Sequence, residues 1–436
     1  MTSGSLTFIL LVMNYHFFIQ SLGCKVNQYD GASLASDLEE LGFEKSKETP
    51  DLVILNTCTV TKNAIAKDRY FLSFLKKKYP NAKLVVMGCW PQTAQKKIDF
   101  FDSEGVFWWG VGKREEFLVH LQKWFNLDGK KISTPNSGLA LTDDWSRYFL
   151  KVGDGCNQFC SYCLIPYARG PIKSRQLVDL VSETKRALDL GLKEIVLTGI
   201  HLGRYGQDFL NTKTSLGDLL RALLLLPGLG RLRLSSIEIN EVDDELIELI
   251  KNNPQICRHL HISLQSGCDK ILKLMRRPYG TDYFLERIKL IRRELPDISL
   301  TTDVIVGFPG ETKEDFLLTK KFIQDLGFSK IHVFPFSAHE KTLAFSMADQ
   351  VEILERKRRA QELRDLSKEL ENNYQEKILA LFQGKELLVV LEALIGEKIR
   401  LKTEYHFDLF LPILSFNLSK GELRDKIGQI LTVKID

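Results

Sequence analysis

The sequence lacks long runs of apolar residues, although 44% of its 436 residues are hydrophobic. No uninterrupted apolar stretch approaches the ~20 residues that a membrane-spanning helix needs. An early apolar run, FILLVM, has no Lys or Arg before it and no small-residue cleavage site after it, which argues against a signal peptide. We therefore expect no membrane segment, and we expect residues 1–12 to be an extension without a fold of its own.

A strong excess of charge of either sign is also lacking, because 60 Lys and Arg residues stand against 56 Asp and Glu residues. The resulting net charge of +4 permits a nucleic-acid partner but does not by itself indicate one. The chain has eight cysteines. Without a secretory signal we expect a reducing, cytoplasmic location, where clustered cysteines bind metal more often than they form disulfides.

The first part of the chain, residues 13–122, alternates between strand-like and helix-like segments. NYHFFIQSLG, DLVILNT and KLVVMG are short apolar runs that end in turn residues, with polar helical stretches between them. This pattern predicts an α/β domain, a parallel sheet with helices on its faces. The following stretch NLDGKKISTPNSG, rich in Gly, Lys, Ser, Asn and Pro, is expected to be a linker.

A second α/β region begins near Tyr148 and is followed by segments of different character. Six strand-like runs alternate with helical patterns, which is too few for an eight-unit barrel and predicts a partial (βα)6 barrel. Residues 349–381 form one long charged pattern, interpreted as a solvated connecting helix. Four short strand-like runs close the sequence and predict a small C-terminal all-β barrel.

Three cysteines lie within eight residues in DGCNQFCSYC, namely Cys156, Cys160 and Cys163. Three thiolates on one loop can bind three irons of a [4Fe–4S] cluster and leave the fourth iron open for a small molecule. Gly153 and Gly155 would let the loop curl. A structural zinc site would need a fourth ligand at matching spacing, and the nearest histidine in the sequence is the distant His201.

Three further cysteines, Cys24, Cys58 and Cys89, each follow a predicted strand. The carboxyl ends of parallel strands share one edge of a sheet, so these side chains are expected to meet there. They predict a second three-thiolate cluster, with ordinary buried cysteines as the alternative. Cys257 and Cys268 have no metal-like spacing and are interpreted as structural residues.

The Cys-x3-Cys-x2-Cys spacing resembles that of the radical S-adenosylmethionine superfamily. Together with SLGCKVNQYD, NTCTVT, MGCWPQ, EIVLTGIHLGRYG, HISLQSG, LKLMRRPY and DVIVGFPGET, it resembles the methylthiotransferases over nearly the whole chain. The resemblance implies an N-terminal methylthiotransferase domain at residues 13–122 with an auxiliary iron–sulfur cluster. It also implies a radical S-adenosylmethionine domain at 142–372 and a TRAM-like RNA-binding domain at 374–436. GCKVN is similar to enzymes that act on N6-threonylcarbamoyladenosine at position 37 of tRNA.

The implied reaction adds a methylthio group to C2 of that adenine. One S-adenosylmethionine supplies a methyl group, carried on sulfur at the cluster of Cys24, Cys58 and Cys89. A second is cleaved at the other cluster and yields a radical that removes the hydrogen from C2, because acid–base residues have no good route to that C–H bond. The resemblance further implies a flavodoxin- or ferredoxin-like electron donor and a sulfur source as partners.

Five residues outside the cysteines are candidates for binding S-adenosylmethionine. Tyr162 occupies the aromatic position that contacts adenine in the superfamily. Gly199, at a strand end, would allow close approach of the methionine end, and Arg277 would pair with its carboxylate. Glu238 and Gln265, near the expected barrel mouth, could bind ribose hydroxyls. Each has a structural alternative: a plain strand-end glycine, a surface arginine or an ordinary hydrogen bond.

Two features bear on the substrate. After HVFPFS the family has a basic residue and then Gly-Thr, whereas this chain reads AHEKTLA, with His339 and Lys341 in those places. In the last region Lys398, Arg400 and Lys402 alternate along a predicted strand, before Tyr405 and His406. Such a face could bind phosphates and bases of tRNA, or could be an ordinary solvated strand face.

Alternative functions remain open at this point. The same chemistry could act on isopentenyladenosine in tRNA or on a ribosomal-protein side chain. A non-catalytic iron–sulfur RNA-binding protein would leave LTGI, LQSG and GFPGE without a purpose. A zinc-stabilised RNA-binding module would contain zinc and no iron.

Overall fold

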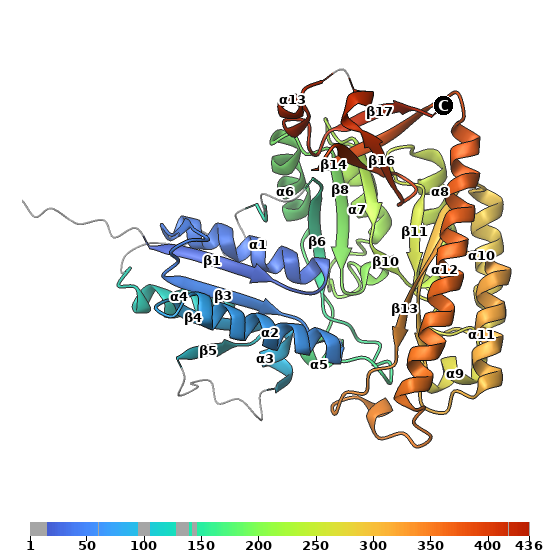
Figure 1. Ribbon diagram of the computed structural model, residues 1–436, viewed down its shortest axis with the longest axis horizontal. Coiled ribbons are helices and arrows are strands. Elements are labelled where there is room, and N and C mark those ends of the chain that lie inside the picture. Colours follow the sequence, from blue (N-terminus) through green and yellow to red (C-terminus); the bar gives the residue numbers. More distant parts are fainter. Residues whose placement is uncertain are drawn as a thin grey trace, which may run out of the picture. The chain divides into compact units, whose positions relative to one another are not determined.

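We describe a computed structural model of the chain for residues 15–59, 61–94, 105–127, 139–141, 146–416 and 418–435 (Figure 1). The chain divides into two compact units, residues 1–59 with 63–140, and residues 60–62 with 141–436. No helix within the described ranges is long and apolar enough to cross a membrane. The predicted extension at 1–12 and most of the predicted linker lie outside the described residues.

The first unit contains a five-stranded parallel sheet of order β2-β1-β3-β4-β5. Its strands are β1 His16–Ser21, β2 Glu44–Lys45, β3 Leu52–Thr57, β4 Lys83–Gly88 and β5 Val106–Trp109. Its helices are α1 Lys25–Glu40, α2 Lys62–Lys78, α3 Cys89–Ala94 and α4 Arg114–Trp124. The predicted parallel α/β domain is therefore confirmed, with β2 and β5 as additional edge strands.

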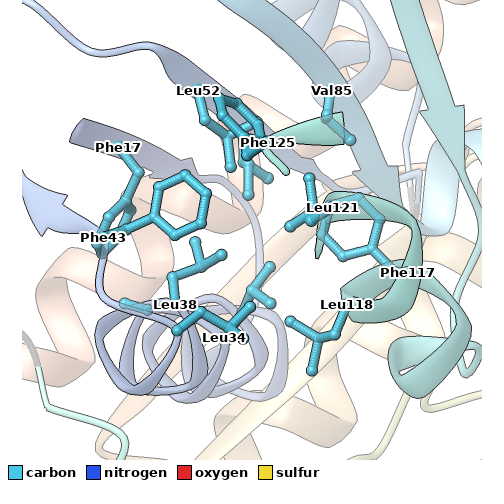
Figure 2. Packing of buried hydrophobic residues seen from close by; sticks show 13 residues of the cluster. Phe17, Leu34, Leu38, Phe43, Leu52, Val85, Phe117, Leu118, Leu121 and Phe125 are labelled. Atoms are coloured by element: carbon cyan, nitrogen blue, oxygen red, sulfur yellow. The ribbon is translucent and has the colours of Figure 1, made fainter. Parts of the chain in front are cut away.

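Successive residues of each strand face opposite sides of this sheet, and each side has its own core. Figure 2 shows the core on the side of α1 and α4, where Leu38 and Leu121 pack against residues of β1, β3 and β4. On the other side Leu75 of α2 packs with Val53 and Val86. Because β3 is buried on both sides, it reads as a continuous apolar run, as parallel sheets require.

The second unit begins with eight strands in two linked sheets, which are parallel except that β7 pairs antiparallel with β6. The first sheet has order β7-β6-β8-β9 and the second β10-β11-β12-β13, and a bridge between Leu232 and Ile256 connects them. No described residues of β13 pair with β6, so the barrel is partial, as predicted. The strands are β6 Tyr148–Asp154, β7 Lys173–Ser174, β8 Glu194–Gly199, β9 Arg231–Leu234, β10 Ser236–Ile237, β11 His259–Ile262, β12 Ser299–Val306 and β13 Lys330–Pro335.

Helices surround these strands and connect them in sequence (Figure 1). They are α5 Ile165–Arg169, α6 Leu177–Asp189, α7 Leu216–Leu224, α8 Asp244–Asn252, α9 Asp269–Leu274, α10 Thr281–Glu294, α11 Lys313–Leu326 and α12 Ile353–Phe382. Single turns of 3-10 helix lie at η1 Leu202–Arg204, η2 Ile239–Glu241 and η3 Leu343–Phe345.

Helix α12 is the long charged helix that the sequence predicts, but it is not solvated all round. Leu363 and Leu366 are buried, and the Ser367 hydroxyl accepts the backbone N–H of Ile331 on β13 at 2.9 Å. Arg359 is also buried and donates to the carboxylate of Glu311 at 2.6 Å. The helix therefore packs against β13, the edge strand of the second sheet, rather than only connecting two regions.

The chain ends in a four-stranded antiparallel sheet of order β16-β15-β14-β17. Its strands are β14 Glu386–Ile395, β15 Lys398–Thr403, β16 Asp408–Pro412 and β17 Ile430–Lys434, and it also carries η4 Ile413–Ser415 and α13 Lys420–Arg424. The prediction of an all-β region is confirmed for the sheet, but the short helices α13 and η4 were not predicted.

Buried charges attach this sheet to the barrel. Glu194 is fully buried and accepts hydrogen bonds from Arg231 at 2.5 Å and Arg233 at 2.8 Å. The same two guanidinium groups donate to the carbonyl oxygens of Lys402 and Thr403, at 2.7 and 2.9 Å. The carboxylate, the two guanidinium groups and the two carbonyl oxygens are thus all hydrogen-bonded. Buried polar groups need such partners, because they have lost their contact with water.

Candidate functional site

The loop of Cys156, Cys160 and Cys163 leaves the carboxyl end of β6 and folds back on itself. The N–H of Cys156 donates to the carbonyl of Gly170 at 3.0 Å, and that of Cys163 to the carbonyl of Cys160 at 3.0 Å. Gly155 has φ +72°, and a Cβ there would lie 1.9 Å from the carbonyl oxygen of Pro171. Only glycine fits this close approach, which curls the loop so that the three sulfurs are half-buried along it.

Each thiol on this loop has a specific environment. The sulfur of Cys156 accepts the N–H of Gln158 at 3.4 Å and lies 3.3 Å from Nδ1 of His201. The sulfur of Cys160 accepts from Arg277 at 3.3 Å. Burial raises the pKa of the Cys163 thiol to about 12, so binding of a metal there must displace a proton.

Arg277 is the centre of the candidate cofactor residues. Its guanidinium is buried and donates to the hydroxyl of Tyr162 at 3.4 Å, to the hydroxyl of Tyr279 at 2.8 Å and to the carboxylate of Glu238. The structure thus brings Arg277, Tyr162 and Glu238 together beside Cys160. Arg277 is not the surface residue of the alternative interpretation.

Gly199 and Gln265 lie at the carboxyl ends of other strands of the same barrel. A Cβ on Gly199 would lie 3.6 Å from the carbonyl oxygen of Gly153, an ordinary contact, so the chain itself does not require glycine there. Gln265 is buried with φ +71°, and its N–H donates to the carbonyl of Asp303 at 2.8 Å. A left-handed conformation is unusual for glutamine and fixes where its side chain leaves the strand.

The two remaining motifs hold this end of the barrel in place. In GFPGE the N–H of Gly307 donates to the carboxylate of Glu311 at 2.6 Å. In the atypical stretch AHEKTLA, the N–H of Ala344 donates to the carbonyl of Ser161 at 2.8 Å. Ser161 stands between Cys160 and Cys163, so the atypical stretch supports the cysteine loop directly.

The second set of cysteines lies at the carboxyl ends of three neighbouring strands of the first unit. Ser21 on β1 pairs with Asn56 on β3, and Thr57 pairs with Gly88 on β4. Cys24, Cys58 and Cys89 follow directly, as the topology argument expects. Gly23 packs so closely that a Cβ on it would lie 2.4 Å from Cβ of Cys58.

Two asparagines of the cysteine motifs connect these turns. The amide of Asn27 donates to the carbonyls of Leu22 at 2.6 Å and Asn56 at 3.2 Å, and the amide of Asn56 donates to the carbonyl of Asn27 at 2.7 Å. The N–H of Cys58 donates to the buried carboxylate of Asp68 at 3.2 Å. Burial raises the pKa of Asp68 to about 7. These bonds fix the backbone around Cys58.

Each of the two donor sets consists of three cysteine thiols, the ligand type of iron–sulfur clusters. Within the described ranges, no three His, Cys, Asp or Glu side chains converge as ligands of one ion. A cluster imposes a different geometry, because each of its irons takes its own thiolate. Two sets of three cysteines, one on a glycine-curled loop and one on adjoining strand ends, are the candidate thiolate donors.

Sequence reasoning missed several residues around the first loop. His201 is distant from Cys156 along the chain and was therefore not considered as a neighbour of the cysteines. In the structure the two side chains are in contact. Nε2 of His201 lies 2.8 Å from the carboxylate of Glu241, which also accepts from Arg204 at 2.8 Å. Their positions after β8 and β10 were the available signal, since strand ends of one barrel share an edge.

Two of the three bases on the predicted phosphate-binding face, Arg400 and Lys402, are paired with acidic residues, while Lys398 is exposed. Arg400 donates to the carboxylate of Glu392 at 2.8 Å, and Lys402 is buried and paired with Asp408. Tyr405 is buried with its hydroxyl donating to Asp297 at 2.9 Å, and His406 stacks on His259 with ring centroids 4.1 Å apart. Acidic residues on the neighbouring strands therefore neutralise Arg400 and Lys402.

Two family profiles match the chain, the radical SAM superfamily over residues 150–323 and Uncharacterized protein family UPF0004 over residues 16–110. A threonylcarbamoyladenosine tRNA methylthiotransferase MtaB from Bacillus subtilis is 34% identical over 95% of this chain and 92% of its own length. The chain belongs to the radical S-adenosylmethionine tRNA methylthiotransferase family. It is therefore a transferase, as predicted.

Other members of the methylthiotransferase family show the same level of similarity. The MtaB protein of Aquifex aeolicus is 34% identical over 95% of this chain and 99% of its own. A tRNA-2-methylthio-N(6)-dimethylallyladenosine synthase from Natranaerobius thermophilus is also 34% identical, over 81% of both chains. The structure of TsrM from Kitasatospora setae, a radical S-adenosylmethionine methyltransferase, aligns with a TM-score of 0.55 at 15% identity, over 76% of this chain and 74% of that one, which supports the fold alone.

Proposed function

We propose that this methylthiotransferase adds a methylthio group to C2 of N6-threonylcarbamoyladenosine at position 37 of tRNA, using two [4Fe–4S] clusters and S-adenosylmethionine. The observation that carries the proposal is the pair of three-cysteine sets, each at the carboxyl ends of parallel strands, where α/β sheets bind ligands. Two sets with three thiolates each leave one open iron per cluster.

The assignment of the substrate depends on the first cysteine motif rather than on overall sequence identity. Relatives named for threonylcarbamoyladenosine and for dimethylallyladenosine are both 34% identical to this chain. GCKVN, with Lys25 and Val26 after Cys24, resembles the first group. Isopentenyladenosine in tRNA is therefore the second candidate substrate.

The residues around Cys156, Cys160 and Cys163 would hold the cluster that cleaves S-adenosylmethionine. Bound there, the cluster and cofactor supply the radical chemistry that an unactivated aromatic C–H bond needs. Tyr162 and Gly199 would contact the adenine and methionine ends, and Glu238 and Gln265 the ribose. Arg277, already held by Glu238 and Tyr279, presents a fixed cation beside Cys160 for the cofactor carboxylate.

Cys24, Cys58 and Cys89 would hold the second cluster, where the sulfur that is transferred receives its methyl group. The hydrogen bonds of Asn27 and Asn56 orient the two turns that carry Cys24 and Cys58. We propose that the first domain, residues 13–122, serves this cluster. Residues 142–372 would serve the radical chemistry, and residues 374–436 would form a TRAM-like RNA-binding domain.

The chemistry also requires partners that this chain does not supply. A flavodoxin- or ferredoxin-like protein would deliver the electron, and a separate sulfur source would replace the sulfur used in each turnover. A cytoplasmic location follows from the proposed tRNA substrate.

The test is mass spectrometry of nucleosides from tRNA of a host that lacks its own enzyme, with and without this chain. We expect a new 2-methylthio derivative of threonylcarbamoyladenosine that disappears in the Cys156→Ala variant. If a methylthio derivative of isopentenyladenosine appears instead, isopentenyladenosine is the substrate. If tRNA is unchanged and the iron-loaded protein does not cleave S-adenosylmethionine, the proposed reaction is wrong. The result would then favour a non-catalytic iron–sulfur RNA-binding protein.

A further inference from the structure

Helix α2 of the first unit has one buried side and one exposed side with an unusual composition. Leu75 is buried in the core, and Phe71 and Leu72 pack partly against it. The other side exposes Lys67, Tyr70, Phe74 and Lys77, which we call the α2 stripe. Their spacing of three and four residues places them on one face of the helix.

The charge on this helix surface has one sign. The only acidic residue of α2 is Asp68, which is buried behind the stripe and accepts the N–H of Cys58. The exposed ionisable residues are basic, and Arg69 and Lys78 flank the stripe. A net charge of only +4 for the chain makes this local excess of bases distinctive. Such a surface attracts phosphate groups.

Two aromatic rings are exposed within the same stripe. Tyr70 is 66% exposed and Phe74 45% exposed, and their rings stack with an interplanar angle of 13° and centroids 6.5 Å apart. The ammonium group of Lys78 lies 6.0 Å from the centroid of Phe74. Large exposed rings are costly in water, whereas stacked on unpaired bases they contribute to RNA binding.

We propose that the α2 stripe and the flanking Lys78 bind the RNA substrate. Lys67, Lys77 and Lys78 contact phosphates, and Tyr70 and Phe74 stack on unpaired bases. The inference rests on the proposed tRNA function and adds a specific RNA surface in the first unit. Exposed lysines beside exposed aromatic rings are suited to RNA, because the lysines can contact phosphates while the rings stack on nucleobases. A protein partner would not need a surface whose charges are all positive. The neutralised bases Arg400 and Lys402 of the last sheet offer no comparable surface.

The electrostatic part is tested with the full-length, iron-loaded protein and an anticodon stem–loop RNA that carries threonylcarbamoyladenosine. The variant Lys67→Gln/Lys77→Gln/Lys78→Gln should bind about tenfold more weakly near 0.1 M salt. The slope of log K against log salt should fall by about 0.7 for each lost phosphate contact. The control variant Lys47→Gln/Lys113→Gln/Lys123→Gln removes the same charge from exposed positions outside α2 and should bind as the wild type does.

The aromatic part is tested with Tyr70→Leu/Phe74→Leu. Loss of stacking should lower affinity about fivefold or more while leaving the salt slope unchanged. All three variants should retain the wild-type circular dichroism spectrum and should cleave S-adenosylmethionine without RNA at the wild-type rate, because the exchanged side chains are exposed.

The outcomes separate this inference from the proposed function. If the wild type binds RNA and both α2 variants bind equally well, the stripe is not an RNA surface and the inference is wrong, which leaves a protein contact as its use. If the control variant weakens as much as the lysine variant, only overall charge matters and the inference is again wrong. If the wild type itself does not bind the RNA, the proposed function fails first.

Discussion

The imidazole of His201 lies with Nδ1 3.3 Å from the sulfur of Cys156. Its other nitrogen lies 2.8 Å from the carboxylate of Glu241, and the side chains of His201 and Glu241 are 9% and 6% exposed. A carboxylate that orients an imidazole toward a metal ligand is a recurrent way to fix that ligand. The arrangement assigns His201 a positioning role for Cys156.

The first prediction concerns this contact. His201→Ala should reduce retention of the cluster at Cys156, Cys160 and Cys163, and with it cleavage of S-adenosylmethionine, by about 10- to 100-fold, as loss of outer ligand partners typically does. The rate of iron loss to a chelator, measured in a Cys24→Ala/Cys58→Ala/Cys89→Ala background, reports on the remaining cluster alone. Arg204→Gln is the control, because this half-exposed residue contacts Glu241 and not the cysteine. If the triple-cysteine variant loses iron at the same rate with and without His201→Ala, His201 does not position Cys156.

The second prediction separates the two cysteine sets by iron content. The wild-type protein, reconstituted without oxygen, should contain about eight irons per chain, and Cys24→Ala/Cys58→Ala/Cys89→Ala about four. The variant should still cleave S-adenosylmethionine but should form no methylthio product. Zinc in place of iron, or an unchanged iron content in the variant, would show that the second set does not bind a cluster.

The third prediction uses the close contact of Gly23 with Cys58. Gly23→Ala introduces a Cβ 2.4 Å from Cβ of Cys58 at a backbone φ of +92°, so the turn must move. We expect about half the iron to be lost and the protein to be destabilised by about 1–3 kcal/mol. Gly105→Ala is a matched control in the same unit, since its φ is +78° and no described atom lies within 4 Å of the new Cβ. Iron loss of equal size in both variants would point to backbone strain rather than to the contact with Cys58.

The sequence predicted the fold where local patterns determine it. Apolar runs bounded by turns predict three of the five strands of the first sheet and every barrel strand except the two-residue β7, with one run covering both β9 and β10. The two-residue strand β2 is too short to show a pattern. Strand β5 is the four-residue apolar run VFWW between Gly105 and Gly110, so the signal of a strand was present in the sequence and was overlooked.

Contacts across the fold were harder to predict than elements. Alternation correctly placed Arg400 and Lys402 on the same side of a strand, but it contains no information about Glu392 and Asp408 on the neighbouring strands. The same limit concealed the contact of His201 with Cys156. By contrast, the meeting of the three N-terminal cysteine loops was predictable, because it depends only on parallel topology.

The fourth prediction concerns the buried charges that join the final sheet to the barrel. Arg233 is fully buried, with its guanidinium shared between Glu194 and the carbonyl oxygens of Thr403 and Glu404. Arg233→Met removes one cation from beside a buried carboxylate and leaves two carbonyls without their donor. The free energy of unfolding should fall by about 3–5 kcal/mol, measured by urea denaturation. Arg221→Met, in an exposed ion pair with Glu245, should leave the unfolding curve nearly unchanged.

The same cluster predicts how stability depends on pH. Although burial opposes ionisation, the three arginines Arg233, Arg231 and Arg147 hold the pKa of Glu194 well below its usual range. A carboxyl group with a lowered pKa in the folded state stabilises the protein above its unfolded pKa of about 4.3, and this contribution is lost as the pH falls below that value. The wild type should therefore lose stability more steeply than Glu194→Gln/Arg233→Met between about pH 4.3 and 2. Parallel stability curves for the two proteins over that range would show that Glu194 is not held ionised by its arginines.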